Sequence, residues 1–264
     1  MTRQASLTFQ IVITLMACAF LIVPAIMSIL AGITVNYFKG IWESGVTLRW
    51  IGEVWVLYAD SILLSLLIAF SCLFATLLVG VPAAYALNNW SGRGARLVEE
   101  FVSLPLSVPG LALALALLQL YGTMKGFRIS WTFILVGHVL YTLPFMIRSV
   151  LAVFASIDLK TLEEGASSLG ATPFQRFRDI AIPNALPGIL AGSLTVVTLS
   201  IGEFNLTWML HTPLTKTLPV GLADSYASMR LEIASAYTLV FFIMIVPLLV
   251  GMQWATSYLQ RVQN

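Results

Sequence analysis

The stretch that decides the fold is EEGASSLGATPFQRFRDIAIP, Glu163 to Pro183, a polar and charged segment inside a chain that is otherwise mostly apolar. Of the 264 residues, 59% are hydrophobic and 10% are charged, and the mean hydropathy is +0.91. A soluble domain carries about 25% charged residues. We therefore expect a protein that crosses the membrane several times, with this segment outside the bilayer.

Six apolar stretches are long enough to cross a bilayer, for which a helix needs about 20 residues. Backbone groups in lipid must find their hydrogen bonds within the segment, so we expect helices throughout. The expected spans are 9–33, 61–87, 101–121, 132–154, 186–210 and 236–258. The first exceeds the apolar region of a cleaved signal peptide, about 7–15 residues, and is predicted to remain. The fold class is thus all-α and polytopic, with one domain, 1–264.

The charge distribution gives an orientation. With six spans both termini face one side, which carries eight of the 14 Lys and Arg residues against six on the other. This small excess favours cytoplasmic termini. The net charge is only +2, without a basic run, so nucleic acid is not an expected partner.

The polar segment, within a loop spanning 156–183, carries the signals of two short helices. Asp158 is placed to cap a helix from Leu159, and Gly170 is placed to end it. Thr172, with Pro173 and Gln175, has the spacing of a capping box that starts a second helix. Such a helix pair either lies on the membrane interface or docks a soluble partner, and local physics leaves both open.

The spacing of the segment resembles the signature loop of permease subunits of binding-protein-dependent ABC importers. That family pattern is Glu-Ala-Ala, three residues, Gly, nine residues, Ile, one residue, Leu-Pro. The chain has Glu164-Gly165-Ala166, then Gly170, Ile180 and Ile182-Pro183, which fits every spacing with two mild departures, Gly165 and Ile182. GVPAAYAL, LPLSVPGLALALALL and GHVLYTLPFMIRS in the second, third and fourth spans are similar to the same family, so the resemblance covers roughly residues 57–259.

The resemblance implies that the loop is cytoplasmic, between the fourth and fifth helices, and forms the coupling helix that docks into the ATPase. The docking residues it implies are Glu163, Glu164, Gly165, Ala166 and Gly170, with Arg176 and Arg178 at the rim. It also implies two ATPase subunits that bind ATP and Mg, a second permease, identical or homologous, a periplasmic solute-binding protein, and the bacterial inner membrane.

Motifs for chemistry within the chain itself are lacking. None of the four lysines follows a glycine, so no phosphate-binding loop of the Gly-Lys-Ser/Thr type exists, and neither HExxH nor GxSxG occurs. Cys18 and Cys72 lie in apolar runs and are interpreted as small hydrophobic residues. We expect no catalytic residue, no metal site and no cofactor in this chain, and an intramembrane enzyme is a poor reading.

Several polar residues at membrane depth are candidates for the translocation path. Glu203 is the foremost, because a carboxylate in a span costs about 2.5–3.5 kcal/mol and therefore usually faces a cavity or a polar partner. His138 and Arg148 are conceivable partners of Glu203, although an interhelical hydrogen bond is the commoner role of such a histidine. The full candidate set is Glu203, Asn205, Ser200, His138, Tyr141 and Gln119.

Gly202-Glu203-Phe204 resembles a stretch found in permeases for iron, sulfate and molybdate. The run from Gly202 to Arg230 resembles the branch with polyamine-type and aminoethylphosphonate-type permeases, although polyamine permeases tend to carry paired acidic residues where this chain has one. We therefore expect a small polar or charged solute of the polyamine or 2-aminoethylphosphonate type, imported by alternating access. The alternatives are a permease for an oxyanion or ferric iron and a secondary carrier driven by an ion gradient.

Overall fold

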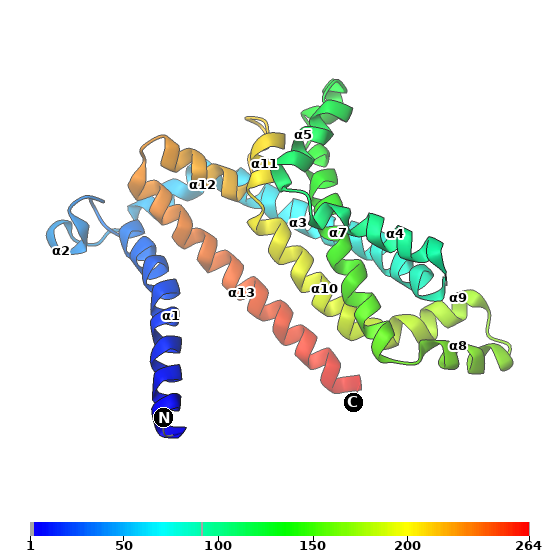
Figure 1. The fold of residues 1–264 in the computed structure, drawn as a ribbon. Coiled ribbons are helices and arrows are strands. Elements are labelled where there is room, and N and C mark those ends of the chain that lie inside the picture. The colour runs from blue at the N-terminus through cyan, green and yellow to red at the C-terminus, as the bar shows by residue number, and fades with distance from the viewer. Residues whose placement is uncertain (1–2, 91, 264) are drawn as a thin grey trace. The chain divides into compact units, whose positions relative to one another are not determined.

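The computed structural model describes residues 3–90 and 92–263, which are helical apart from connecting segments and one isolated bridge between Thr34 and Val46. The helices are α1 (Arg3–Gly32), α2 (Gly40–Ser44), α3 (Arg49–Asn89), α4 (Arg93–Ser103), α5 (Gly110–Tyr121), α6 (Lys125–Arg128), α7 (Trp131–Ser156), α8 (Leu159–Ser168), α9 (Pro173–Gln175), α10 (Ile182–Gly202), α11 (Asn205–Leu210), α12 (Leu218–Ala227) and α13 (Leu231–Gln263) (Figure 1). Contacts divide the chain into two compact units. The first unit is Met1–Ala59 with Gly221–Val246, and the second is Asp60–Val220 with Pro247–Asn264.

Membrane crossing is carried by long apolar helices. Within the described residues, five helices are long and apolar enough to cross a bilayer, and a bent helix pair makes a sixth if it counts as one span. The five are Phe9–Gly32, Arg49–Asn89, Trp131–Ser156, Pro173–Gly202 and Leu231–Tyr258, and the pair is Arg93–Leu106 with Gly110–Tyr121. The all-α polytopic class is confirmed.

The stretch 101–121, expected as one span, is bent in the structure. α4 passes into a short 3-10 turn, Leu104–Leu106, and α5 then starts at Gly110 after a bend of 103°. Pro109 lacks the backbone N–H that a continuous helix would need and restricts the residue before it to extended conformations. The two prolines of this stretch therefore separate two helices.

The stretch 186–210, expected as one span, also differs. α10 ends at Gly202, Glu203 and Phe204 are not helical, and α11 begins at Asn205. At its other end α10 is continuous with the preceding loop, because α9 leads into it through a π-helical turn, Arg176–Ala181. Pro183 cannot donate a backbone hydrogen bond to the preceding turn, which is one reason for the irregular winding there.

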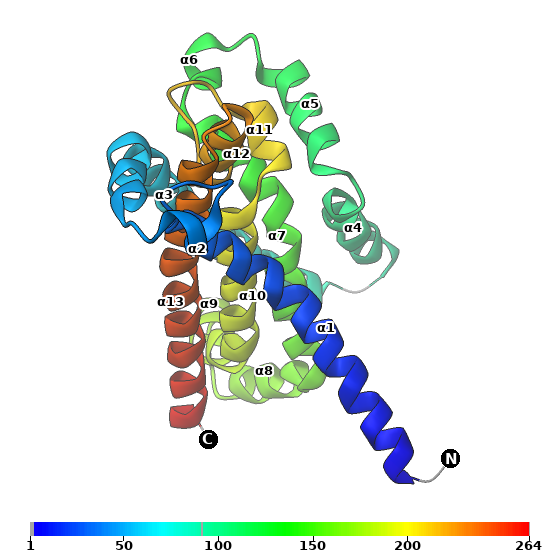
Figure 2. The ribbon, with the colours of Figure 1, turned by 90° about the vertical axis from the view of Figure 1, so that its left-hand side faces the viewer.

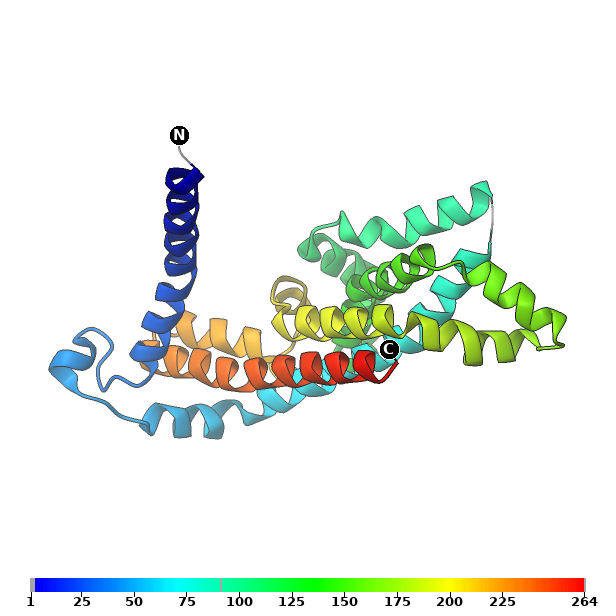
Figure 3. The ribbon, with the colours of Figure 1, turned by 90° about the horizontal axis from the view of Figure 1, so that it is seen from below.

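The core of the second unit lies between α7 and α10, which run side by side (Figure 2). Glycines on α10 allow the close approach: a Cβ added to Gly188 would lie 2.5 Å from the carbonyl oxygen of Ser149. Met146, Val150 and Val196 are fully buried in this packing. α8 and α9, drawn in yellow-green, lie at the starting end of α10 (Figure 3).

The first unit is held together where α1, α3 and α13 meet. A Cβ on Gly32 would lie 2.7 Å from the backbone of Ser235 and Ala236, so α1 and α13 are in backbone contact. Tyr58 stacks on Tyr237 with ring centroids 4.8 Å apart, and Ser225 donates a 2.8 Å hydrogen bond to the Tyr58 hydroxyl.

Candidate functional site

The loop between α7 and α10 is shaped by its own local hydrogen bonds. Asp158 accepts hydrogen bonds from the backbone and the hydroxyl of Thr161, which lower the pKa of its carboxyl group. Gly170, at φ +87°, ends α8 in a Schellman motif, in which Gly170 N–H bonds to Ser167 O and Ala171 N–H bonds to Ala166 O, each 3.0 Å long. A non-glycine residue is strained at such a positive φ.

A capping box starts the second helix of the loop. Gln175 N–H bonds to the Thr172 hydroxyl at 3.3 Å, and Thr172 N–H bonds to the Gln175 side chain at 2.8 Å. These local predictions for the loop, the aspartate cap, the glycine end and the capping box, are confirmed.

Neighbouring glutamates of α8 face opposite ways. Glu163 is buried and accepts hydrogen bonds from the Tyr85 hydroxyl and, at 3.2 Å, from the Asn89 side chain, both on α3. Glu164 is exposed, 3.9 Å from Lys160 on the same helix face. Glu163 therefore ties the loop to α3 and is not part of the outward surface where it was expected.

The other expected docking residues also differ in exposure. Gly165 and Gly170 are exposed, with open space where a Cβ would lie, whereas Ala166 and Arg176 are half-buried. Arg178 is exposed and held by Asp179 at 2.7 Å. Two apolar side chains of the same loop, which the sequence did not single out, are also exposed: Leu169 is 91% exposed and Phe174 is 67% exposed. For Leu169 the available signal was its position directly before the helix-ending glycine.

Glu203 lies in the break between α10 and α11. Its carboxylate accepts the backbone N–H of Leu206, at 3.2 Å from Oε1 and 3.1 Å from Oε2. The other break in the unit comes close to it, since a Cβ on Gly110, the first residue of α5, would lie 3.1 Å from Glu203 Oε1. The carboxylate therefore lies where two interrupted helices begin, and helix starts favour negative charge.

Neither expected partner contacts Glu203. Arg148 donates to the Ser103 hydroxyl at 3.3 Å. His138 is fully buried, with Nδ1 2.8 Å from Ser200 Oγ and Nε2 2.8 Å from Thr207 Oγ1. A neutral imidazole has one donor and one acceptor nitrogen, which suits these two hydroxyls. The imidazole thus bridges α10 and α11 across the break.

The buried polar cluster extends to α3. The Thr142 hydroxyl donates to His138 O at 2.7 Å and lies 3.1 Å from Cys72 Sγ. His138 and Ser200 are therefore packed between helices of this chain. The remaining pathway candidates lie nearer the surface: Asn205 and Gln119 are exposed, and Tyr141 is half-buried.

Some residues of these arrangements carried no signal in the sequence. Tyr85, Asn89, Thr207 and Gly110 are distant in the chain from the groups they meet, and only the fold brings them together. Over the described residues, no group of three His, Cys, Asp or Glu side chains is arranged to hold a metal ion.

Comparison with known proteins decides the family. The model for the inner membrane component of binding-protein-dependent transport systems matches residues 76–263. The chain belongs to this family. It is therefore a permease of the type found in ABC importers, as the loop spacing predicted, and in this family ATPase activity belongs to separate subunits.

Two curated relatives of this permease have named solutes. The putative 2-aminoethylphosphonate transport system permease protein PhnV of Salmonella typhimurium is 28% identical over 219 residues, 80% of each chain. The spermidine/putrescine transport system permease protein PotC of Escherichia coli K12 is 30% identical over 207 residues, 76% of each chain.

Solved structures share the fold of the permease. A bacterial alginate ABC transporter in complex with an alginate pentasaccharide-bound periplasmic protein matches with a TM-score of 0.78 and 16% identity, covering 99% of this chain and 96% of that one. The inward-facing methionine transporter MetNI matches with a TM-score of 0.65 and 20% identity, covering 80% and 98%. At such identities the likeness concerns the fold alone.

Proposed function

We propose that this permease imports a small solute bearing a primary ammonium group, of the 2-aminoethylphosphonate or polyamine type, by alternating access driven by ATP. The named solutes of PhnV and PotC, although one is a phosphonate and the others are polyamines, share an amine. An amine is protonated at neutral pH, so a carboxylate on the path would attract it.

The position of Glu203 is the observation that carries this proposal. Its described hydrogen bonds come from backbone N–H groups, and none of its described interactions is with a cationic side chain. A partly buried carboxylate without a cation is electrostatically suited to a passing ammonium group. The break in the helix places the carboxylate on irregular backbone, which at membrane depth occurs where it is buried in protein or lines a water-filled cavity.

The second part of the proposal is that the loop couples ATP hydrolysis in a separate subunit to transport. Its exposed surface, formed by Glu164, Gly165, Leu169 and Gly170, is offered to one of two ATPase subunits that bind ATP and Mg. The complete transporter would contain a second permease, identical or homologous, and receive solute from a periplasmic binding protein. The loop and both termini would then face the cytoplasm.

The test is uptake into proteoliposomes that contain the assembled transporter, with its cognate binding protein outside and ATP inside. Radiolabelled spermidine, 2-aminoethylphosphonate and sulfate are compared. We expect ATP-dependent uptake of one amine and none of sulfate. Glu203→Gln should lower amine uptake at least about tenfold, the loss of one close charge pair, whereas Glu100→Gln on exposed α4 serves as the control.

Two results would contradict the proposal. Uptake of sulfate with neither amine transported would show an oxyanion permease. Uptake that continues without ATP and follows an imposed ion gradient would show a secondary carrier instead.

A further inference from the structure

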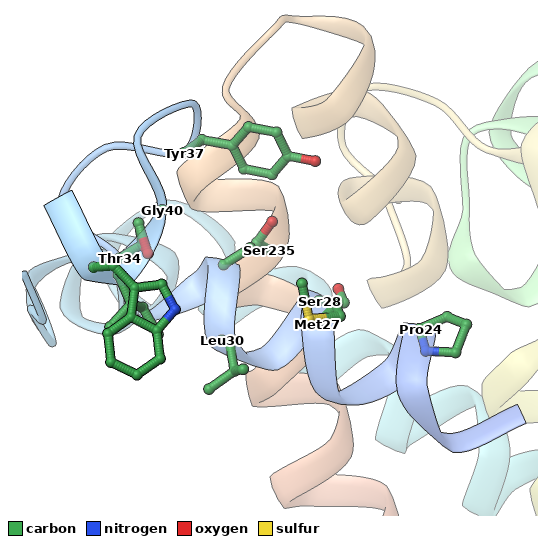
Figure 4. A pocket seen from close by; sticks show the side chains of 11 residues that line it. Pro24, Met27, Ser28, Leu30, Thr34, Tyr37, Gly40 and Ser235 are labelled. Atoms are coloured by element: carbon green, nitrogen blue, oxygen red, sulfur yellow. The ribbon is translucent and has the colours of Figure 1, made fainter. Parts of the chain in front are cut away.

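The polar side chains around His138 are enclosed by protein, whereas polar side chains such as Ser28 and Ser235 in the first unit line a pocket of about 620 Å³ (Figure 4). His138, Thr142 and Thr207 are at most 1% exposed, and each has a hydrogen-bonding partner within the chain. Buried polar groups cost free energy unless they are paired, and a fully paired cluster holds the elements around it in one arrangement. The cluster around His138 is therefore suited to fixing positions rather than to binding a ligand.

Two adjacent residues of α7 hold α11 in place. His138 Nε2 lies 2.8 Å from the Thr207 hydroxyl. Gly137 leaves room for α11, because a Cβ there would lie 2.7 Å from Leu206 Cδ2 and 2.8 Å from Leu210 Cδ1. Both leucines are fully buried. α11 therefore has one polar and one apolar attachment to the same turn of α7.

The attached turn of α11 also holds the Glu203 carboxylate. The N–H of Leu206, the residue before Thr207, donates to Glu203 Oε1 at 3.2 Å and to Oε2 at 3.1 Å. On the other side of the break, His138 Nδ1 lies 2.8 Å from the hydroxyl of Ser200 at the end of α10. The imidazole thus holds the backbone both before and after the carboxylate.

The break needs such support from outside because its own backbone supplies little. Glu203 and Phe204 are not helical, so helical backbone bonds do not fix them. α11 has six residues, and a helix this short is not stable by itself. The attraction between a carboxylate and an ammonium group depends on their separation. A frame that keeps the carboxylate in one place therefore affects how it meets a solute.

We propose that His138 is a positioning residue for transport. Without contacting the solute, it ties α11 to the end of α10, so that the Glu203 carboxylate stays where the ammonium group passes. This role rests on the function proposed for Glu203, because a positioned carboxylate matters only if the solute meets it. Thr207 should contribute more than Ser200, because Thr207 adjoins the residue whose N–H holds the carboxylate.

The experiment is a double-mutant cycle on the assembled transporter in proteoliposomes, with ATP inside and uptake expressed per intact transporter. The probe is radiolabelled spermidine or 2-aminoethylphosphonate, whichever the wild type imports, on saturating binding protein. Thr207→Val removes the hydroxyl that His138 meets and should lower turnover by about threefold to tenfold, the loss of one hydrogen bond. The KM for the loaded binding protein should stay unchanged. In a Glu203→Gln background, the same substitution should lower the remaining uptake no further.

Two variants serve as controls. Thr207→Ser keeps the hydroxyl and should retain turnover close to that of the wild type. Thr142→Val removes a hydroxyl of the same cluster that donates to His138 O within α7 and does not reach across the break. It should leave turnover unchanged in both backgrounds, whereas a purely structural role of the cluster would make it as harmful as Thr207→Val.

Two results would overturn the positioning role alone. Equal losses from Thr207→Val with and without Glu203→Gln would show that the hydrogen bond acts on transport independently of the carboxylate. Equal losses from Thr207→Val and Thr142→Val would show that the cluster only supports the fold. If Glu203→Gln by itself leaves uptake unchanged, the proposed function fails and the positioning role fails with it.

Discussion

Two interruptions of regular helix, the corner at Gly170 and the break at Glu203, are held in different ways. At the corner, the Schellman bonds to Ala166 and Ser167 and the capping box of Thr172 come from residues within a few positions. At the break, the imidazole of His138, more than 60 positions away, bridges the two sides. The corner is therefore encoded locally, whereas the break depends on the packed fold.

The largest effect should come from removing the long-range bridge. His138→Leu leaves the hydroxyls of Ser200 and Thr207 without their buried partner, and we expect a loss of about 2–4 kcal/mol in unfolding free energy. Thermal denaturation of the purified permease in detergent measures it. His211→Leu is the control, because the His211 ring bonds only to Trp208 O in its own turn, and equal losses would refute a special role for His138.

The adjacent glutamates of α8 allow the stability of the fold to be tested separately from the proposed docking. Glu163→Ala leaves the Tyr85 hydroxyl and the Asn89 amide without their acceptor and should cost about 1–3 kcal/mol in stability. Glu164→Ala should change stability by no more than about 0.5 kcal/mol.

The proposed docking role of Glu164 is tested by a transport measurement. Glu164→Lys should uncouple ATP hydrolysis from uptake in proteoliposomes while the permease stays folded in the membrane. Unchanged uptake in Glu164→Lys would contradict the docking role, and unchanged stability in Glu163→Ala would contradict the inward link.

Two glycines of the loop should respond with opposite signs. Gly170→Ala forces a Cβ into a positive φ and should destabilise by about 1–2 kcal/mol. Gly165→Ala, in the middle of α8 with open space around it, should stabilise by about 0.5–1 kcal/mol, because alanine favours helix. Denaturation curves of both variants decide this, and destabilisation by Gly165→Ala would show a contact that the isolated chain lacks.

The smallest effect concerns the aspartate cap. Hydrogen bonds from Thr161 lower the pKa of Asp158 below its ordinary value of 3.8. The cap is therefore fully present above that value and is lost as the pH falls through the lowered pKa. Amide exchange at Thr161, corrected for intrinsic rates, should speed up over that acidic range. Asp158→Asn, whose cap does not titrate, should show no such change.

Features set by neighbouring residues could be predicted from the sequence, whereas features set by distant contacts could not. The helix starting after Asp158, the end at Gly170 and the family spacing needed only neighbouring residues, and all were predictable. The inward turn of Glu163 was not, because a run of two glutamates does not say which one meets Tyr85 on α3. The break at Glu203 was missed because neither Glu203 nor Phe204 is a helix breaker, so the apolar stretch around them resembles one continuous span.

The continuity of Pro173–Gly202 has a mechanical consequence. Its 30 residues form one rod of about 45 Å, with the loop at one end and Glu203 just beyond the other. Tilting such a rod by about 10° around its midpoint moves its two ends about 4 Å in opposite directions. With such a tilt, a displacement of the loop toward one side would move the Glu203 carboxylate toward the opposite side, without any helix having to unwind.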